Sequence, residues 1–160
     1  MKKLLFLFCL LSWSVLHAQK TINRPPFIAK ATETIEIAAV HLSDTATVID
    51  VDAKFTPKYW IRIAPATCLV ADNGERYQVR QGVGVELGQE FWMPESGEAS
   101  FSLIFPPLPP SVKSFDFVEG EGERDFNLFG ISLTGKLPKL QLPKGLEKAG
   151  KMTAVALPAP

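Results

Sequence analysis

Cysteine and histidine carry most nucleophilic, redox and metal chemistry, and the chain has only two of each. Cys9 and His17 lie in a predicted export signal, so His41 and Cys68 would be the last of their kind after its removal. A metal site built from several histidines cannot form with a single histidine, and a serine triad would depend on His41 alone. No Cys-x-x-Cys pair is present for dithiol exchange. We therefore expect no catalytic residues, no cofactor and no enzymatic activity.

Cys68 stands in a strand-like run between Thr67 and Leu69. An unpaired cysteine in such a setting is usually a buried small hydrophobe. The alternative interpretations are a reactive or intermolecular thiol, or a nucleophile and base formed with His41. With a single cysteine remaining, no intrachain disulfide can form, and the apolar core has to hold the fold.

Carboxylates are the other candidates for chemistry. Glu36, Asp50 and Asp52 would project from the polar faces of adjacent strands. Paired carboxylates can hydrolyse glycosidic bonds when one of them is desolvated and their spacing is right. An exposed sheet face meets neither condition, so we do not expect catalysis from these residues.

A second group of carboxylates lies in a glycine-containing connection, at Glu119, Glu121, Glu123 and Asp125. Hard cations such as calcium prefer oxygen ligands, so a weak calcium site is one hypothesis. The spacing is not that of an EF-hand loop, and a solvated turn is the simpler interpretation.

Four aromatic residues near expected strand ends are candidates for binding: Tyr59, Trp60, Phe91 and Trp92. They could form a platform that stacks on sugars or holds a peptide. The alternative is that the tryptophans cap the core. An exposed strand edge that pairs with an extended segment of a partner is a further binding mode for such a domain.

The first 18 residues have the pattern of a secretory signal peptide, with Lys2 and Lys3 before the apolar stretch 4–16 and a small residue, Ala18, before Gln19. As a helix, the apolar stretch would rise about 20 Å, less than the roughly 30 Å of a bilayer core. We expect cleavage after Ala18, export to the periplasm or cell envelope, and no membrane span afterwards.

Charge is distributed unevenly along a chain that has 17 basic and 17 acidic residues in total. Residues 21–135 contain more acidic than basic residues, whereas the tail 136–160 is rich in Lys, Leu and Pro. The absence of an overall positive charge disfavours nucleic-acid binding. We interpret the tail as a linker or docking arm and 19–33 as an extended lead-in to a domain over 34–135.

Alternating apolar and polar residues, separated by Gly, Pro and Asn, indicate strands rather than helices. We expect an all-β, immunoglobulin-like sandwich of seven to eight antiparallel strands, with a small β-barrel as the alternative. The clearest segments are 34–41, 46–55, 59–63, 67–71, 76–80, 99–105, 114–119 and 126–133, and a further short strand is expected at 90–93 before Pro94. The predicted core includes Phe55, Trp60 and Phe126 together with the inward-facing aliphatic and Phe residues of these segments.

Two connections have specific signals. Asn73-Gly74 between alternating runs predicts a tight hairpin turn. Pro106, Pro107, Pro109 and Pro110 cannot sit inside a sheet and predict a stiff connection across the end of the sandwich.

Five segments together resemble the N-terminal domain that precedes thioredoxin-fold thiol-disulfide oxidoreductases, of the alkyl hydroperoxide reductase and thiol-specific antioxidant type, in Gram-negative envelopes. The segments are 24–27, 44–48, 59–63, 91–101 and 114–120, and the resemblance covers about residues 22–155. It implies a non-catalytic accessory module whose partner is a downstream redox domain or another envelope protein. No catalytic residue can be transferred, because the family's active cysteines lie outside the matched region. The alternative is a stand-alone envelope protein that binds a glycan, a peptide or calcium.

Overall fold

The structure is a computed structural model that describes residues 19–120, 122 and 125–137. Within these residues the chain forms twelve β-strands and no helix. The strands are β1 (Lys20–Asn23), β2 (Ala29–Lys30), β3 (Ile35–Leu42), β4 (Thr47–Lys54), β5 (Trp60–Ile61), β6 (Cys68–Ala71), β7 (Arg76–Gln78), β8 (Gln81–Val83), β9 (Phe91–Trp92), β10 (Glu98–Phe105), β11 (Ser114–Val118) and β12 (Asn127–Ser132).

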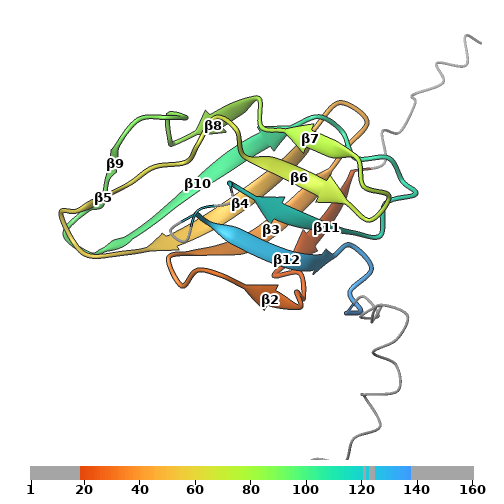
Figure 1. Cartoon of the computed structure of the whole chain (residues 1–160), viewed down its shortest axis with the longest axis horizontal. Helices are drawn as coiled ribbons and strands as arrows, with labels where there is room; N and C mark the ends of the chain where they lie inside the picture. The colour runs from red at the N-terminus through yellow and green to blue at the C-terminus, as the bar shows by residue number, and fades with distance from the viewer. Residues whose placement is uncertain (1–18, 121, 123–124, 138–160) are drawn as a thin grey trace, which may run out of the picture.

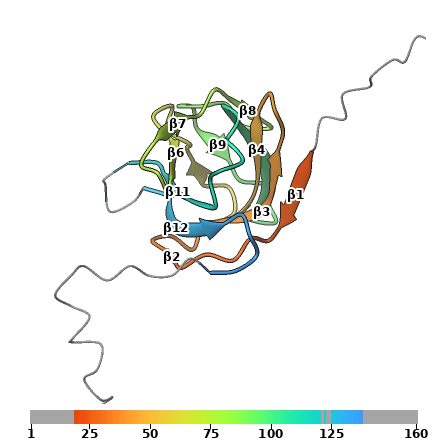
Figure 2. The same cartoon turned by 90° about the vertical axis from the view of Figure 1, so that its right-hand side faces the viewer.

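Two antiparallel five-stranded sheets pack face to face (Figures 1 and 2). The first sheet has the order β1-β3-β4-β10-β8, and the second has the order β2-β12-β11-β6-β7. β5 and β9 form a separate two-stranded ladder at one end of the sandwich (Figure 1). The expected sandwich is confirmed, and the alternative of a closed barrel is wrong, because each sheet ends in two edge strands.

The core lies between the two sheets and depends on strict alternation along the central strands. In β4, Ile49, Val51 and Ala53 are buried, while Asp50 and Asp52 face outward. Phe105 and Phe117 meet edge to face across the sandwich with ring centroids 6.4 Å apart, the geometry that aromatic quadrupoles favour. Aromatic and aliphatic burial thus builds the core, and Cys68, the cysteine of the described residues, is a free thiol.

Both lateral edges of the sandwich are covered by a segment that passes from one sheet to the other. β7 and β8 do this on one side, where the N–H of Arg80 donates to the carbonyl of Ile104 at 2.7 Å. On the other side the chain leaves β1, passes Pro26 and enters β2. Residues 19–33, expected to be a lead-in ahead of the domain, therefore supply an edge strand to each sheet.

Three strands were not expected from the sequence, namely β1, β2 and β8. The first two flank Pro25 and Pro26, which suppress a strand signal, and β8 contains Gly82. A Cβ at Gly82 would clash with the carbonyl oxygen of Val85, so only glycine allows the backbone to fold back this closely.

Two β-bulges change which side chains face outward. In β3 the register shifts between Ile37 and Ala39, so that Val40 is fully buried and His41 faces outward. In β12 a shift opposite Asp116 leaves Gly130 at φ 65°, and the Asp116 carboxylate accepts its N–H at 2.6 Å.

The predicted hairpin turn is confirmed, with a more specific geometry. The Gly74 N–H donates to Ala71 O at 2.8 Å, the Ala71 N–H donates to Glu75 O at 2.9 Å, and Gly74 has φ 86°. This is a three-residue loop over residues 72–74 that ends in a left-handed glycine.

Candidate interaction surfaces

The ladder β5–β9 places two tryptophans on the outside of the molecule. Trp60 and Trp92 are directly opposite each other, and so are Ile61 and Phe91. Residues opposite each other in an antiparallel pair project from the same face. Ile61 is buried and Phe91 packs towards Phe101, with ring centroids 6.0 Å apart. The tryptophan pair therefore occupies the outer face.

The four predicted binding aromatics are thus divided between two environments. Trp60 is 42% exposed, Trp92 60% and Tyr59 62%, whereas Phe91 packs against the core. Single exposed apolar side chains are common on protein surfaces, but neighbouring ones that form a patch are typical of interaction sites. We call Trp60 and Trp92, which share the outer side of the ladder, the aromatic face; Tyr59 is exposed beside it in the sequence.

A hollow of about 620 Å³ adjoins the aromatic face and is lined by Trp60, Phe55 and Arg62, among others. Phe55 is 39% exposed. Placing Phe55 and Trp60 in the core was therefore wrong, since both lie past the end of the sandwich, where alternation no longer reports burial. Phe126 is only partly buried and packs against the edge of the core.

His41 and Cys68 do not meet. His41 lies on β3 of the first sheet and Cys68 on β6 of the second, where the thiol is buried and accepts a hydrogen bond from the Arg76 guanidinium at 3.1 Å. The interpretation of Cys68 as a buried small side chain is confirmed. Burial on the far sheet leaves no route by which His41 could act as its base.

A hydrogen-bonded row crosses four strands on the outer face of the first sheet. Thr21 Oγ1 is 3.0 Å from His41 Nδ1, His41 Nε2 is 2.7 Å from Asp50 Oδ2, and Ser102 Oγ donates to Asp50 Oδ1 at 2.7 Å. Partial burial raises the pKa of Asp50, but the hydrogen bonds from Ser102 and His41 and the attraction to His41 outweigh it and leave this pKa below its usual 3.8.

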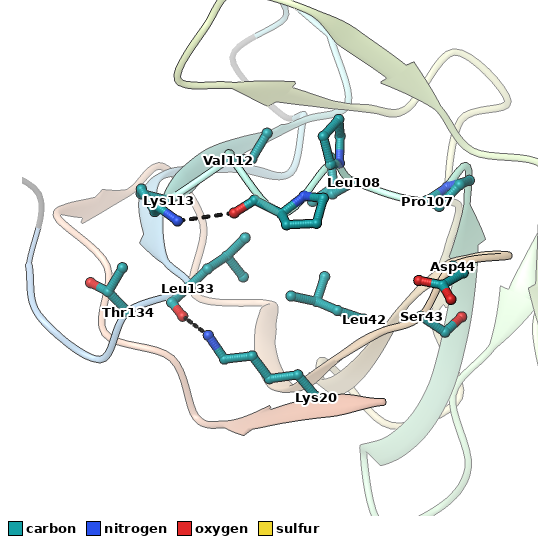
Figure 3. A pocket seen from close by; sticks show the side chains of 12 residues that line it. Lys20, Leu42, Ser43, Asp44, Pro107, Leu108, Val112, Lys113, Leu133 and Thr134 are labelled. Atoms are coloured by element: carbon teal, nitrogen blue, oxygen red, sulfur yellow. Dashed lines mark hydrogen bonds between the residues drawn. The ribbon is translucent and has the colours of Figure 1, made fainter. Parts of the chain in front are cut away.

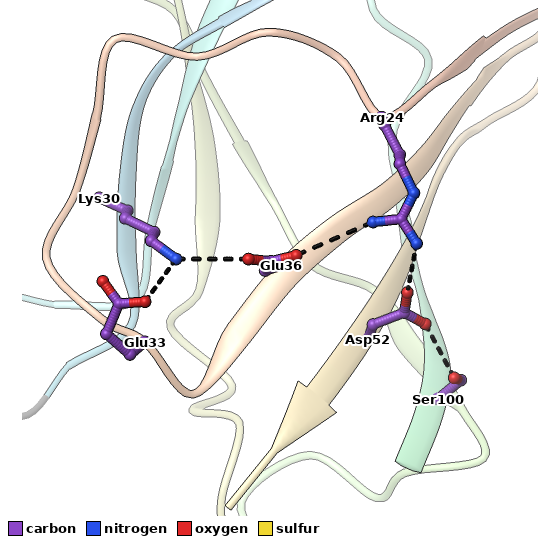
Figure 4. Close-up of polar contacts among 6 residues, drawn as sticks. All are labelled: Arg24, Lys30, Glu33, Glu36, Asp52 and Ser100. Carbon is purple, nitrogen blue, oxygen red and sulfur yellow. Dashed lines mark hydrogen bonds and ion pairs between the residues drawn. The ribbon is translucent and has the colours of Figure 1, made fainter. Parts of the chain in front are cut away.

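A parallel row contains the carboxylates that could have formed a hydrolytic pair. Glu36 and Asp52 are opposite each other, and Arg24 bridges them with nitrogen–oxygen distances of 3.8 and 3.6 Å (Figure 4). Ser100 donates to Asp52 at 2.9 Å. Both carboxylates are exposed and already paired, so the row is a solvated surface that ties β1 to the centre of the sheet.

Two of the four predicted calcium ligands lie in the described part of the chain, and both are engaged with backbone. The carboxylate of Glu119 accepts N–H groups from Ala64 and Phe126, each at 2.8 Å, and Asp125 accepts the N–H of Gly122 at 2.7 Å. Glu121 and Glu123 lie outside the described residues. Over residues 19–120, 122 and 125–137 no cluster of three or more His, Cys, Asp or Glu side chains could hold a metal ion.

Glu119 instead fastens the loop before β6 to the connection before β12. Burial raises the pKa of its carboxyl group above the usual 4.5, although both backbone N–H groups and Arg62 act in the opposite direction. Sequence reasoning missed this role because nothing along the chain links Glu119 to Ala64, 55 residues away.

The row through His41 was also missed. Its only sequence signal is the outward alternation of Asp50, since the bulge at Ala38 and the strand containing Thr21 could not be anticipated.

In the described portion of the chain, no helix has the length and apolar character needed to cross a membrane. Comparison of the chain with protein families, curated proteins and solved structures finds no match to any of them.

Proposed function

We propose that this chain is a non-catalytic interaction module of an exported protein, and that it binds its partner through the aromatic face. The observation that carries the proposal is the pairing of two exposed tryptophans, Trp60 and Trp92, on the outer face of β5–β9. Tryptophan and tyrosine dominate the energetics of protein interfaces because each buries a large area with little loss of side-chain entropy.

The scaffold around the aromatic face supports a binding role. Met93 donates its N–H to the carbonyl of Tyr59 at 2.8 Å, extending the β5–β9 ladder, and its side chain is buried. An ion pair of 2.9 Å joins Lys58 to Glu95 across the neighbouring loops. A surface held in place before binding loses less conformational entropy when a partner docks.

The proposed partner is a thioredoxin-fold thiol-disulfide oxidoreductase domain, as the sequence resemblance implies. Contact with it would be non-covalent, because the Cys68 thiol is buried, with the Arg76 guanidinium hydrogen-bonded to it, and is unavailable for a mixed disulfide. The module would position such a domain or dock it to another envelope protein.

A titration of the purified chain with a periplasmic thioredoxin-fold oxidoreductase tests the proposal by calorimetry. We expect saturable binding that weakens at least tenfold in a Trp60→Ala, Trp92→Ala double variant. Val83→Ala is the matched control, because Val83 is a comparably exposed apolar residue on the edge strand β8. Equal affinity of the double variant and the wild type would contradict the proposal, and so would a dithiol-dependent reductase rate from the chain alone.

A glycan is the second candidate ligand, and the same tryptophan pair favours it. Two indole rings on one face can stack against the apolar faces of sugar rings. Titration with oligosaccharides distinguishes the candidates: saturable binding of a glycan that depends on both tryptophans, without binding of the oxidoreductase, would replace the first proposal with the second.

A further inference from the structure

A second surface feature lies at the opposite end of the sandwich. β4 and β10 run side by side, with Lys54 and Glu98 at the end near the aromatic face and Thr47 and Phe105 at the other. Beyond Thr47 and Phe105, a hollow of about 640 Å³ opens between the sheets, within the usual range for small-molecule pockets.

The interior of this hollow is aliphatic. Leu108, Val112 and Leu133 are buried in its wall, and half-buried Leu42 faces them from the end of β3 (Figure 3). We call it the aliphatic pocket. The side chains come from three separate segments, which the sandwich brings together at one end.

Backbone hydrogen bonds hold the wall in shape without a ligand. The N–H of Leu108 donates to the buried hydroxyl of Thr47 at 3.0 Å, and the N–H of Val112 donates to Pro109 O at 3.0 Å. The N–H of Leu133 donates to Lys113 O at 2.8 Å. Pro107, Pro109 and Pro110 also line the pocket and have no N–H.

Two ammonium groups stand at one side of the mouth. Lys20 Nζ donates to Leu133 O at 2.7 Å, and Lys113 Nζ donates to Pro110 O at 2.9 Å. Neither lysine forms an ion pair with a carboxylate of the described residues. Asp44 lies on the opposite side of the pocket (Figure 3).

We propose that the aliphatic pocket binds an unbranched aliphatic carboxylate, with the carboxylate between Lys20 and Lys113 and the chain against Leu42, Val112 and Leu133. Each ammonium retains N–H donors that the carbonyl oxygen does not use. The negative charge of Asp44 repels a carboxylate from the far side, so the ligand has one preferred orientation. This inference concerns the end of the sandwich remote from the aromatic face and does not depend on it.

An aliphatic chain fits this wall better than a peptide does. A peptide buries an amide at every residue, and each amide needs a hydrogen-bond partner to avoid a large desolvation cost. The nearby N–H groups of Leu108, Val112 and Leu133 are already bonded. Methylene groups make no such demand.

Calorimetric titration of the purified chain with sodium dodecanoate, below the concentration at which it forms micelles, tests the proposal. We expect one dodecanoate per chain and at least tenfold weaker binding of dodecyltrimethylammonium, which has the same alkyl chain and the opposite charge. A Lys20→Met, Lys113→Met double variant should bind dodecanoate at least tenfold more weakly. Thr134→Trp, which places a bulky ring at the exposed rim, should reduce binding by a similar factor.

Lys58→Met is the matched control, because Lys58 is an exposed lysine near the other end of the sandwich, and it should bind as the wild type does. All substituted side chains are exposed, so unchanged unfolding midpoints would show that the variants fold. Each of three results would overturn the proposal. The first is equal binding of dodecanoate and dodecyltrimethylammonium, and the second is equal affinity of the double variant and Lys58→Met for dodecanoate. The third is tighter binding of an aliphatic peptide than of dodecanoate.

Discussion

His41 on β3 and Asp50 on β4 are joined by a hydrogen bond of 2.7 Å between Nε2 and Oδ2. The bond exists because the bulge at Ala38 turns His41 to the outer face, where the alternation of β4 also places Asp50. Ser102 donates to the second oxygen of the same carboxylate. Asp50 therefore connects β3, β4 and β10.

Asp50→Asn should remove an acid-dependent part of the stability. The pKa of Asp50 in the folded state lies below its usual 3.8, so the folded state favours the carboxylate. The resulting stabilisation is present above pH 3.8 and is lost as the pH falls through the folded-state pKa. Urea unfolding at pH 7 and at pH 2.5 should show a deficit of the variant relative to wild type that shrinks in acid. A deficit that stays constant would show that the titration of Asp50 is not linked to folding.

Lys58→Gly should stabilise the protein by about 0.5–1 kcal/mol, because a non-glycine residue at positive φ pays a steric cost that glycine avoids. Lys58 has φ 63° and follows Pro57 in a turn closed by the Tyr59 N–H and the Thr56 carbonyl at 3.1 Å. This is the type II position that favours glycine. Lys58→Ala is the control: it removes the ion pair with Glu95 but keeps the strained φ, and thermal unfolding should show no gain. A gain from alanine equal to that from glycine would contradict the strain argument.

Glu119→Ala should lower the free energy of unfolding by about 2–4 kcal/mol, because it leaves the N–H groups of Ala64 and Phe126 without their acceptors. Glu119→Gln keeps one acceptor oxygen and should cost less. The comparison requires denaturant unfolding of both variants at neutral pH.

The pH dependence of Glu119 has the opposite sign to that of Asp50. Since burial raises the pKa of Glu119 above 4.5 in the folded state, the folded protein takes up this proton more readily than the unfolded chain. Stability from this group grows as the pH falls through the folded-state pKa towards 4.5. The free energy of unfolding of the wild type should therefore rise relative to that of Glu119→Gln as the pH is lowered from 7 to 4.5. A relative fall over that range would contradict the assignment.

Gly74→Ala and Gly97→Ala should differ although both positions have positive φ, 86° and 70°. A Cβ at Gly74 meets nothing within 4 Å, so alanine should cost about 1–2 kcal/mol from backbone strain alone. At Gly97 the Cβ would lie 2.6 Å from the carbonyl oxygen of Phe55, a backbone atom that cannot move cheaply. Thermal unfolding should show the larger loss of stability for Gly97→Ala. Equal losses of stability would mean that this close approach does not destabilise the alanine variant.

Much of the sandwich was predictable from local alternation, as Asp50 and Asp52 facing away from Ile49 and Val51 illustrate. The bulge at Ala38 was not, because Ala38, Ala39 and Val40 are all apolar and hide the change of spacing between Ile37 and Val40. Phe55 and Trp60 were assigned to the core by their apolar type, and this was wrong because apolar type predicts burial only where a second sheet covers the residue.

The surfaces were less predictable than the fold. Tyr59, Trp60 and Trp92 were recognisable by residue type, but their exposure depends on where the β5–β9 ladder sits. The aliphatic pocket joins Lys20 to Lys113 and Leu42 to Leu133, pairs that are remote in the sequence. Only the tertiary structure relates them.

The most direct test of the proposed interaction is the accessibility of the two tryptophans in the free and bound states. Of the three tryptophans of the chain, Trp13 lies in the expected signal peptide, so the cleaved chain, or a Trp13→Phe version of the whole chain, reports only Trp60 and Trp92. Acrylamide should quench their fluorescence strongly in the free chain and weakly when the thioredoxin-fold partner is bound at saturation. Tryptophans that are already protected in the free chain, or that stay equally quenchable in the complex, would contradict a binding role for the aromatic face.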